Sequence, residues 1–286
     1  MRIGIAVKPG LVEARDTLLG VATWLAEHRV EAVWSKDAAA LMPATPDTVV
    51  ERAELPRHVD LVLALGGDGT LLALAAAIAN ADVDIPILGI NFGSLGFLTE
   101  ITRPEIFASL EAVLNGRATH DERIMLRATS QAGSITPSVA LNDIVFSRTA
   151  LSRMIELAVS VGEQPVASVR ADGLIVATPT GSTAYNLSAG GPIVHPAMDA
   201  IVLTPIAPHT LTNRPIVIPA SREVRVRAEG SNAGDVYITI DGQSGFKLSA
   251  DDEITILRSN RPLRLVRASN RSYFEVLREK LKWNLT

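Results

Sequence analysis

The 286-residue chain contains no cysteine, which excludes a disulfide framework and thiolate chemistry. It has no apolar run near the roughly 20 residues that a membrane-spanning helix needs, and residues 1–7 are typical of a strand rather than a signal peptide. Basic residues are scattered and the formal net charge is −4, so no nucleic-acid or anionic-membrane partner is indicated. We therefore expect a soluble, cytoplasmic protein. Its hydrophobic fraction of 47% is ample for a core.

The pattern of apolar segments changes near residue 115. Before it, short apolar stretches alternate with stretches of helical periodicity around 11–28, 71–80 and 104–115, which predicts a parallel α/β sheet. After it, short alternating or β-branched stretches are separated by turn clusters, which predicts a mostly β domain. The expected strands are 3–7, 31–34, 61–65 and 87–91 in the first part, and 123–129, 139–146, 154–161, 174–177, 223–227, 236–240, 253–257 and 263–267 in the second.

The chain is thus expected to form an α/β domain over 1–115 and a β-rich domain over 116–267. Within the tail 268–286, Phe274, Leu277 and Leu281 lie at helical spacing. We expect this terminal helix to pack back on the first domain.

A glycine-rich turn lies between the strand expected at 61–65 and an apolar helical stretch. The turn consists of Gly66, Gly67, Asp68, Gly69 and Thr70. Its glycines let a ligand approach the backbone closely, and the N–H groups that open a helix attract anions. Because a carboxylate would repel a bare phosphate, Asp68 is better suited to hold Mg²⁺ or to accept a proton from an attacking hydroxyl. The alternative is that Asp68 only caps the helix.

A second unusual region, residues 170–192, is dense in hydroxyl-bearing side chains and almost free of charge after Asp172. Such a surface suits a neutral sugar, an adenine, or a phosphate that backbone amides bind. The alternative is a Ser/Thr-rich turn and helix cap. A loop of this length favours a binding role.

Together these segments resemble the NAD kinase family of bacterial type over most of the chain. The turn at 66–70 is shared with lipid kinases and phosphofructokinases. Three further segments are similar to NAD kinases and not to those families: Leu141-Asn-Asp143, the run from Asp172 to Ser188, and Pro208-His-Thr-Leu-Thr-Asn-Arg-Pro215. The resemblance implies an α/β N-terminal domain like that of phosphofructokinase and diacylglycerol kinase, a β-rich C-terminal domain, and a nucleotide site between them.

The resemblance also implies the chemistry, which is transfer of the γ-phosphoryl of ATP to the 2′-hydroxyl of the adenosine ribose of NAD, giving NADP and ADP. It implies Asp68 as the catalytic base and a divalent metal ion, Mg²⁺ or Mn²⁺, that accompanies ATP, with no metal-ligand set specified. No lysine follows the glycines, so backbone amides and the metal must handle the phosphate charge.

The family's NAD contacts carry over residue by residue. They are Asp68, Gly69, Ala73, Asn142, Asp143, Arg153, Arg170, Asp172, Thr183, Ala184, Tyr185, Asn186, Leu187, Ser188, Ala207 and Gln243, with Gly66, Gly67, Gly69 and Thr70 as the phosphate-binding turn. Asn and Asp can bind ribose hydroxyls or an adenine amino group, and a tyrosine ring can stack on a base. Taken singly, Asn142-Asp143 could be a strand-end turn and Gln243 part of a hairpin turn. A charged residue at position 170 accompanies a preference for NAD over NADH in relatives.

The resemblance further implies a homo-oligomer, dimer or tetramer, whose NAD site is completed across a subunit contact. Two other classes remain as alternatives. A lipid kinase would share the glycine turn, but the polar stretch 178–188 argues against a hydrophobic acceptor cleft. A non-catalytic NADP(H) sensor would keep the dinucleotide contacts, but the presence of Asp68 and of the intact turn argues against it.

Overall fold

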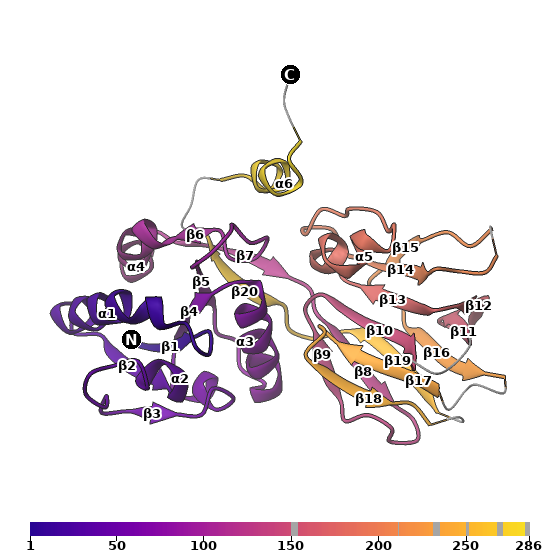
Figure 1. Ribbon diagram of the computed structural model, residues 1–286, viewed down its shortest axis with the longest axis horizontal. Coiled ribbons are helices and arrows are strands. Elements are labelled where there is room, and N and C mark those ends of the chain that lie inside the picture. The colour runs from indigo at the N-terminus through magenta and orange to yellow at the C-terminus, as the bar shows by residue number, and fades with distance from the viewer. Residues whose placement is uncertain (150–153, 211, 231–234, 250–251, 268–270, 284–286) are drawn as a thin grey trace. The chain divides into compact units, whose positions relative to one another are not determined.

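The computed structural model describes residues 1–149, 154–210, 212–230, 235–249, 252–267 and 271–283 (Figure 1). Contacts divide the chain into two compact units: unit 1 combines Met1–Glu122 with Leu263–Thr286, and unit 2 is Arg123–Pro262. In the described part of the chain, no helix is both long and apolar enough to cross a membrane.

Unit 1 is the α/β domain that the sequence predicts. Its strands are β1 (Arg2–Val7), β2 (Glu31–Ser35), β3 (Val49–Val50), β4 (Leu61–Gly66), β5 (Ile87–Asn91), β6 (Ile101–Thr102), β7 (Thr119–Arg123) and β20 (Leu263–Arg267). Its helices are α1 (Arg15–Glu27), α2 (Lys36–Ala39), α3 (Asp68–Ala81), α4 (Ile106–Leu114) and α6 (Tyr273–Leu281), with 3₁₀ turns η1 (Val12–Ala14), η2 (Leu55–His58) and η3 (Arg103–Glu105).

The strands of this sheet follow the order β3-β2-β1-β4-β5-β20-β7, and β6 also pairs with β5. The pairs β1·β2, β1·β4 and β4·β5 are parallel. Every residue of β4 and β5 is buried, as expected for strands of a parallel sheet covered on both faces. This burial explains why both strands are continuous apolar runs in the sequence.

The position of β20 differs from the sequence-based division at 116–267. Residues 263–267 form a strand, but β20 belongs to the sheet of unit 1, where Leu265 pairs in parallel with Ile87. Its alternating pattern predicts a strand without indicating which sheet the strand joins.

The terminal helix α6 also belongs to unit 1. A capping box begins it, because the Ser272 hydroxyl accepts from the Glu275 N–H (3.3 Å) and the Glu275 carboxylate accepts from the Ser272 N–H (2.6 Å). Arg271 donates to the Glu100 carbonyl (2.7 Å), and Lys280 lies over the Phe97 ring, 5.7 Å from its centroid. These contacts attach the helix to the loop that follows β5.

Unit 2 consists of two six-stranded antiparallel sheets. One has the order β15-β14-β13-β10-β17-β18 and the other β12-β11-β16-β19-β8-β9. The strands are β8 (Leu126–Ser130), β9 (Ser138–Ala140), β10 (Asp143–Arg148), β11 (Ile155–Val161), β12 (Gln164–Ala171), β13 (Gly173–Ala177), β14 (Ala200–Ile206), β15 (Ile216–Pro219), β16 (Val224–Glu229), β17 (Val236–Ile240), β18 (Ser244–Lys247) and β19 (Glu253–Arg258). A 3₁₀ turn η4 (Thr180–Thr183) and the short helix α5 (Tyr185–Ser188) follow β13.

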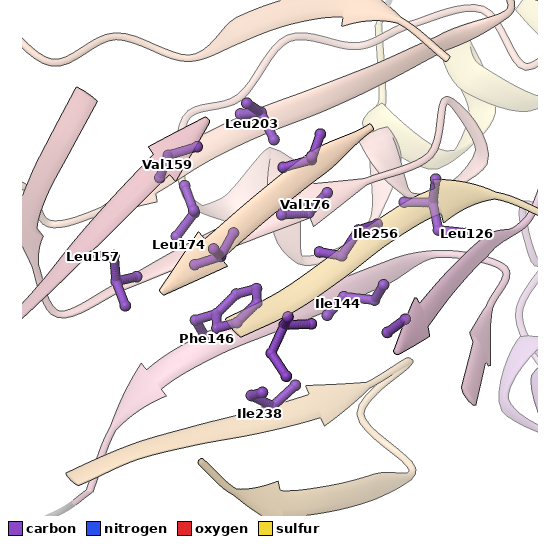
Figure 2. Close-up of a cluster of buried hydrophobic side chains, with 14 of the residues drawn as sticks. Leu126, Ile144, Phe146, Leu157, Val159, Leu174, Val176, Leu203, Ile238 and Ile256 are labelled. Atoms are coloured by element: carbon purple, nitrogen blue, oxygen red, sulfur yellow. The ribbon is translucent and has the colours of Figure 1, made fainter. Parts of the chain in front are cut away.

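Side chains from both sheets form one apolar core. Figure 2 shows Ile144 and Phe146 of β10 beside side chains of strands from the other sheet, among them Ile256 of β19. Strands such as β19 bury alternate residues, whereas β13 is buried along its whole length. A second apolar cluster that includes Ile175 and Val194 accounts for the difference, because it covers the outer face of β13 with the chain that follows α5.

Candidate active site

The glycine turn connects β4 to α3. An added Cβ at Gly66 would lie 2.5 Å from the Thr70 hydroxyl oxygen, so this close approach requires a glycine. Nothing lies within 4 Å of a Cβ built at Gly67 or Gly69, so there is room for a ligand group beside these two Cα atoms. Ala73 follows on α3 and is partly buried.

Asp68 does not cap α3. It is the first residue of the helix, and the N-cap is Gly67. Its carboxylate instead accepts four hydrogen bonds from a loop about 30 residues away. The Phe97 N–H donates to Oδ2 (2.8 Å), while the Leu98 N–H (3.1 Å), the Thr99 N–H (3.1 Å) and the Thr99 hydroxyl (3.0 Å) donate to Oδ1. The carboxylate therefore has a fixed position at the edge of the turn.

The loop 92–99 that holds Asp68 was not among the residues expected from the sequence. It begins after β5, whose last residue Asn91 pairs with Gly66 of β4, so both strands end at the same edge of the sheet. Asn91 shapes the loop, because its Nδ2 donates to the Ser94 carbonyl (2.8 Å) and its Oδ1 accepts from the Gly93 N–H (2.6 Å). A second glycine-containing stretch after a buried strand is the sequence signal that could have identified it.

In unit 2, Asn142 and Asp143 lie where β10 begins. The carboxylate of Asp241 holds this segment by accepting three backbone N–H groups, from Leu141 (2.8 Å), Asn142 (2.7 Å) and Asp143 (3.0 Å). Gln243 is exposed in the same turn, between β17 and β18. Both Asp241 and Gly242 have positive φ, so the expected hairpin turn is present.

Asp143 and Asp241 are both buried carboxyl groups with raised pKa values. Burial, and secondly the charge of Asp241, raises the pKa of Asp143 to about 7. Burial also raises the pKa of Asp241, while the three backbone N–H groups act in the opposite direction. Asp241 was not expected as a site residue, because it lies about 100 positions after residues 141–143, with which it interacts.

The hydroxyl-rich segment is attached to the same place. The Thr178 hydroxyl donates to the Leu141 carbonyl (2.6 Å), and the Gly181 N–H donates to the Thr178 hydroxyl (3.0 Å). A Cβ at Gly181 would lie 2.0 Å from the Asn142 carbonyl oxygen, so only glycine fits there. Segments 141–143, 178–188 and 241–243 therefore meet at one end of the sheet.

The residues expected between 183 and 188 have different environments. Thr183, Ala184 and Leu187 are partly buried, whereas Tyr185 and Ser188 are exposed. Tyr185 is 47% exposed, so its ring is available for stacking. Asn186 is fully buried and its amide is used internally. It donates to the Ser182 and Pro192 carbonyls (both 3.0 Å) and accepts from the Thr204 hydroxyl (2.6 Å).

Arg170, Asp172 and Ala207 lie at the other end of β13. Asp172 accepts from Arg148 Nε (2.9 Å), the exposed Arg170 is on β12, and Ala207 follows β14 with a φ of 44°. The register confirms the separation, because β10 pairs Asp143 with Ala177 and pairs Ser147 with Gly173. Arg153 lies outside the described residues.

The comparisons with known proteins agree with the expected family. The family model for the ATP-NAD kinase N-terminal domain matches residues 3–118, and the model for the ATP-NAD kinase C-terminal domain matches residues 141–268. The NAD kinase of Geotalea daltonii is 48% identical over 235 residues, 82% of this chain and 82% of that protein. The NAD kinase of Syntrophotalea carbinolica is 42% identical over 287 residues, 99% of this chain and 98% of that protein.

Solved structures are similar over nearly the whole chain. Yeast NADH kinase complexed with NADH has a TM-score of 0.88 at 28% sequence identity, covering 100% of this chain and 89% of that one. An NAD kinase from Archaeoglobus fulgidus in complex with ATP has a TM-score of 0.76 at 29% identity, covering 99% of both chains.

Proposed function

This chain belongs to the NAD kinase family, and we propose that it transfers the γ-phosphoryl group of ATP to the 2′-hydroxyl of the adenosine ribose of NAD, giving NADP and ADP. The observation that carries this proposal within the chain is the carboxylate of Asp68, held by four hydrogen bonds beside an open glycine turn. A lipid acceptor is not supported by the polar segment that follows β13.

In the proposed reaction, Asp68 accepts the proton of the ribose 2′-hydroxyl. At the same time the ribose oxygen forms a bond to the γ-phosphorus, and the bond between that phosphorus and the ADP oxygen breaks. A secondary hydroxyl is a poor nucleophile at neutral pH, so it needs a base and in-line placement. The space beside the Cα atoms of Gly67 and Gly69, at the start of α3, suits the phosphates.

We propose that Mg²⁺ or Mn²⁺ reaches the site bound to ATP, as part of the substrate. Among the described residues, no three or more His, Cys, Asp or Glu side chains form a group that could hold a metal. In sites for phosphoryl transfer, Mg²⁺ takes many of its ligands from substrate phosphates and water. The residues present therefore fit an ion that arrives on the triphosphate, where it offsets phosphate charge.

We propose that NAD contacts the end of unit 2 where segments 141–143, 178–188 and 241–243 meet. The exposed Tyr185 ring, Asn142 and the buried Asp143 supply a stacking surface and hydrogen-bonding groups at this end. For Asn186 the structure supports an indirect role, because both the NH₂ group and the oxygen of its amide are hydrogen-bonded within the chain.

A product assay tests the proposed function. Purified protein is incubated with Mg²⁺-ATP and NAD, or NADH in parallel, and NADP is detected with a strictly NADP-specific dehydrogenase. We expect NADP from the wild type and a loss of at least about 10²-fold in kcat for Asp68→Asn, the scale for a lost general base.

The amide that Asp68→Asn introduces still offers one oxygen to the loop but turns its NH₂ group toward another N–H, so a melting curve must accompany the kinetics. Near-normal turnover in folded Asp68→Asn would contradict the assigned base. A folded wild type that binds NADP without forming it would favour the sensor alternative.

A further inference from the structure

The two oxygens of the Asp68 carboxylate have unequal environments. Oδ1 accepts from the Leu98 N–H, the Thr99 N–H and the Thr99 hydroxyl, whereas Oδ2 accepts from the Phe97 N–H. A carboxylate oxygen has about two lone-pair sites. With three donors Oδ1 is saturated by the protein, while Oδ2 keeps a site for a group of the substrate.

The Thr99 hydroxyl is the one side-chain donor in this set. Thr99 is 1% exposed, and Asn91 Nδ2 lies 3.2 Å from its hydroxyl oxygen and 3.3 Å from its carbonyl oxygen. Because Asn91 donates to the hydroxyl oxygen, the hydroxyl hydrogen is directed to Asp68 Oδ1. The chain of bonds runs from Asn91 through Thr99 to the carboxylate.

The space around this contact is tightly filled. A Cβ at Gly96 would lie 2.0 Å from Asp68 Oδ1 and 2.4 Å from the Thr99 hydroxyl oxygen. The glycine therefore lets the loop close on the carboxylate so that the hydroxyl and the N–H groups reach it together.

We propose that Thr99 is a positioning residue, whose hydroxyl acts with the two N–H groups on Oδ1 to fix the orientation of the Asp68 carboxylate, so that Oδ2 is the atom that accepts the proton of the ribose 2′-hydroxyl. This inference rests on the proposed function. The terminal torsion of an aspartate is broad and roughly two-fold, so its carboxylate has no strong orientation of its own. Proton transfer in an in-line reaction needs the acceptor atom within hydrogen-bond reach of the hydroxyl.

The matched variants are Thr99→Ser and Thr99→Ala, which differ only in the hydroxyl group. Steady-state rates are measured for NADP formation with NAD and ATP varied separately. We expect Thr99→Ala to lower kcat by about 10-fold, a fraction of the effect of a lost base, with both KM values changed less than about two-fold. Thr99→Ser should keep most of kcat. Thr99→Val, which is close in shape to threonine, should behave like Thr99→Ala.

Melting temperatures of all variants separate positioning from folding, because rates are compared well below the lowest melting temperature. The inference is overturned if Thr99→Ala keeps the wild-type kcat, if Thr99→Ser loses as much as Thr99→Ala, or if the loss lies in KM alone. It is also overturned, together with the proposed function, if the wild type forms no NADP. An active wild type with an unaffected Thr99→Ala overturns the inference and leaves the proposed function standing.

Discussion

At the scale of single residues, the buried carboxyl group of Asp143 makes the stability of the protein depend on pH. Its side chain is 5% exposed, and burial together with the charge of Asp241 raises its pKa to about 7. An aspartate in an unfolded chain titrates near pH 4. Because the folded state binds this proton more tightly, its contribution to stability is fully present below about pH 4 and is lost as the pH rises to about 7.

Replacing Asp143 with Asn removes this titration. We expect the melting temperature of Asp143→Asn, relative to wild type, to rise from pH 5 to pH 8, because only the wild type must bury a charge at the higher pH. Thermal unfolding at several pH values measures the trend, with Glu163→Gln as an exposed control in the same unit. A difference that does not vary with pH would contradict the assignment.

The residue types indicated which ligands a side chain is able to bind, but not which contacts that side chain makes in the folded chain. Resemblance identified Asn142, Asp143 and Gln243, and the structure places them at one end of the sheet, but their roles toward NAD stay predictions. Asp241 was missed because its three hydrogen bonds reach residues about 100 positions earlier. Asn186 has the right chemistry for a ligand, yet its buried amide is bonded within the chain.

At the scale of elements, the site depends on two neighbouring strands, β4 and β5, that end together. The apolar runs 61–65 and 87–91 predicted both strands, because strands covered on both faces need continuous apolar sequence. Their adjacency, which brings the turn at Asp68 against the loop 92–99, comes from the parallel pairing of Gly66 with Asn91. Local pattern contains no information on that pairing.

Two glycines of this loop give a matched test of its role. A methyl group at Gly96 would collide with Asp68 Oδ1 at 2.0 Å, whereas nothing lies within 4 Å of a Cβ at Gly93. We expect Gly96→Ala to lower kcat by roughly 10-fold or more, since displacement of a catalytic group by about an ångström has such effects. Gly93→Ala should stay near wild type. Equal rates in the two folded variants would show that the loop does not position Asp68.

At the scale of the whole molecule, the pattern of apolar segments predicted an α/β part followed by a β-rich part, and the fold class is confirmed. The chain path is more complex than a division at residue 115. The contact units separate after Glu122, and the chain returns at Leu263 to place β20 between β5 and β7. β20 joins a sheet whose first strand, β1, starts at Arg2, about 260 positions earlier in the chain. The five residues of β20 predict a strand, but they contain no information on which sheet it joins.

Among the described residues, the expected NAD contacts in unit 2 lie near the two opposite ends of β13. Asp172 and Thr178 flank the five residues of β13, so six steps of extended chain separate them, about 20 Å at the usual rise per residue. A ligand cannot lie along this path, because every residue of β13 between them is buried. We therefore propose a homo-oligomer in which one subunit supplies the end with Asp143, and its partner supplies the end with Arg170, Asp172 and Ala207.

Mixing two inactive variants tests this arrangement. We expect Asp68→Asn and Asp172→Ala each to be inactive, and their mixture after subunit exchange to recover up to about a quarter of wild-type activity if the protein is a dimer. Half of the random dimers are then mixed, and one of the two sites in each has both native residues.

Asp172 is an apt choice because its ion pair with Arg148 is partly exposed, so its loss should leave the fold intact. Each variant mixed with itself is the control, and light scattering gives the number of subunits. Recovery requires Asp68 and Asp172 from different chains in one site, so no recovery despite proven exchange would place these two residues in the site of a single subunit and contradict the proposed arrangement.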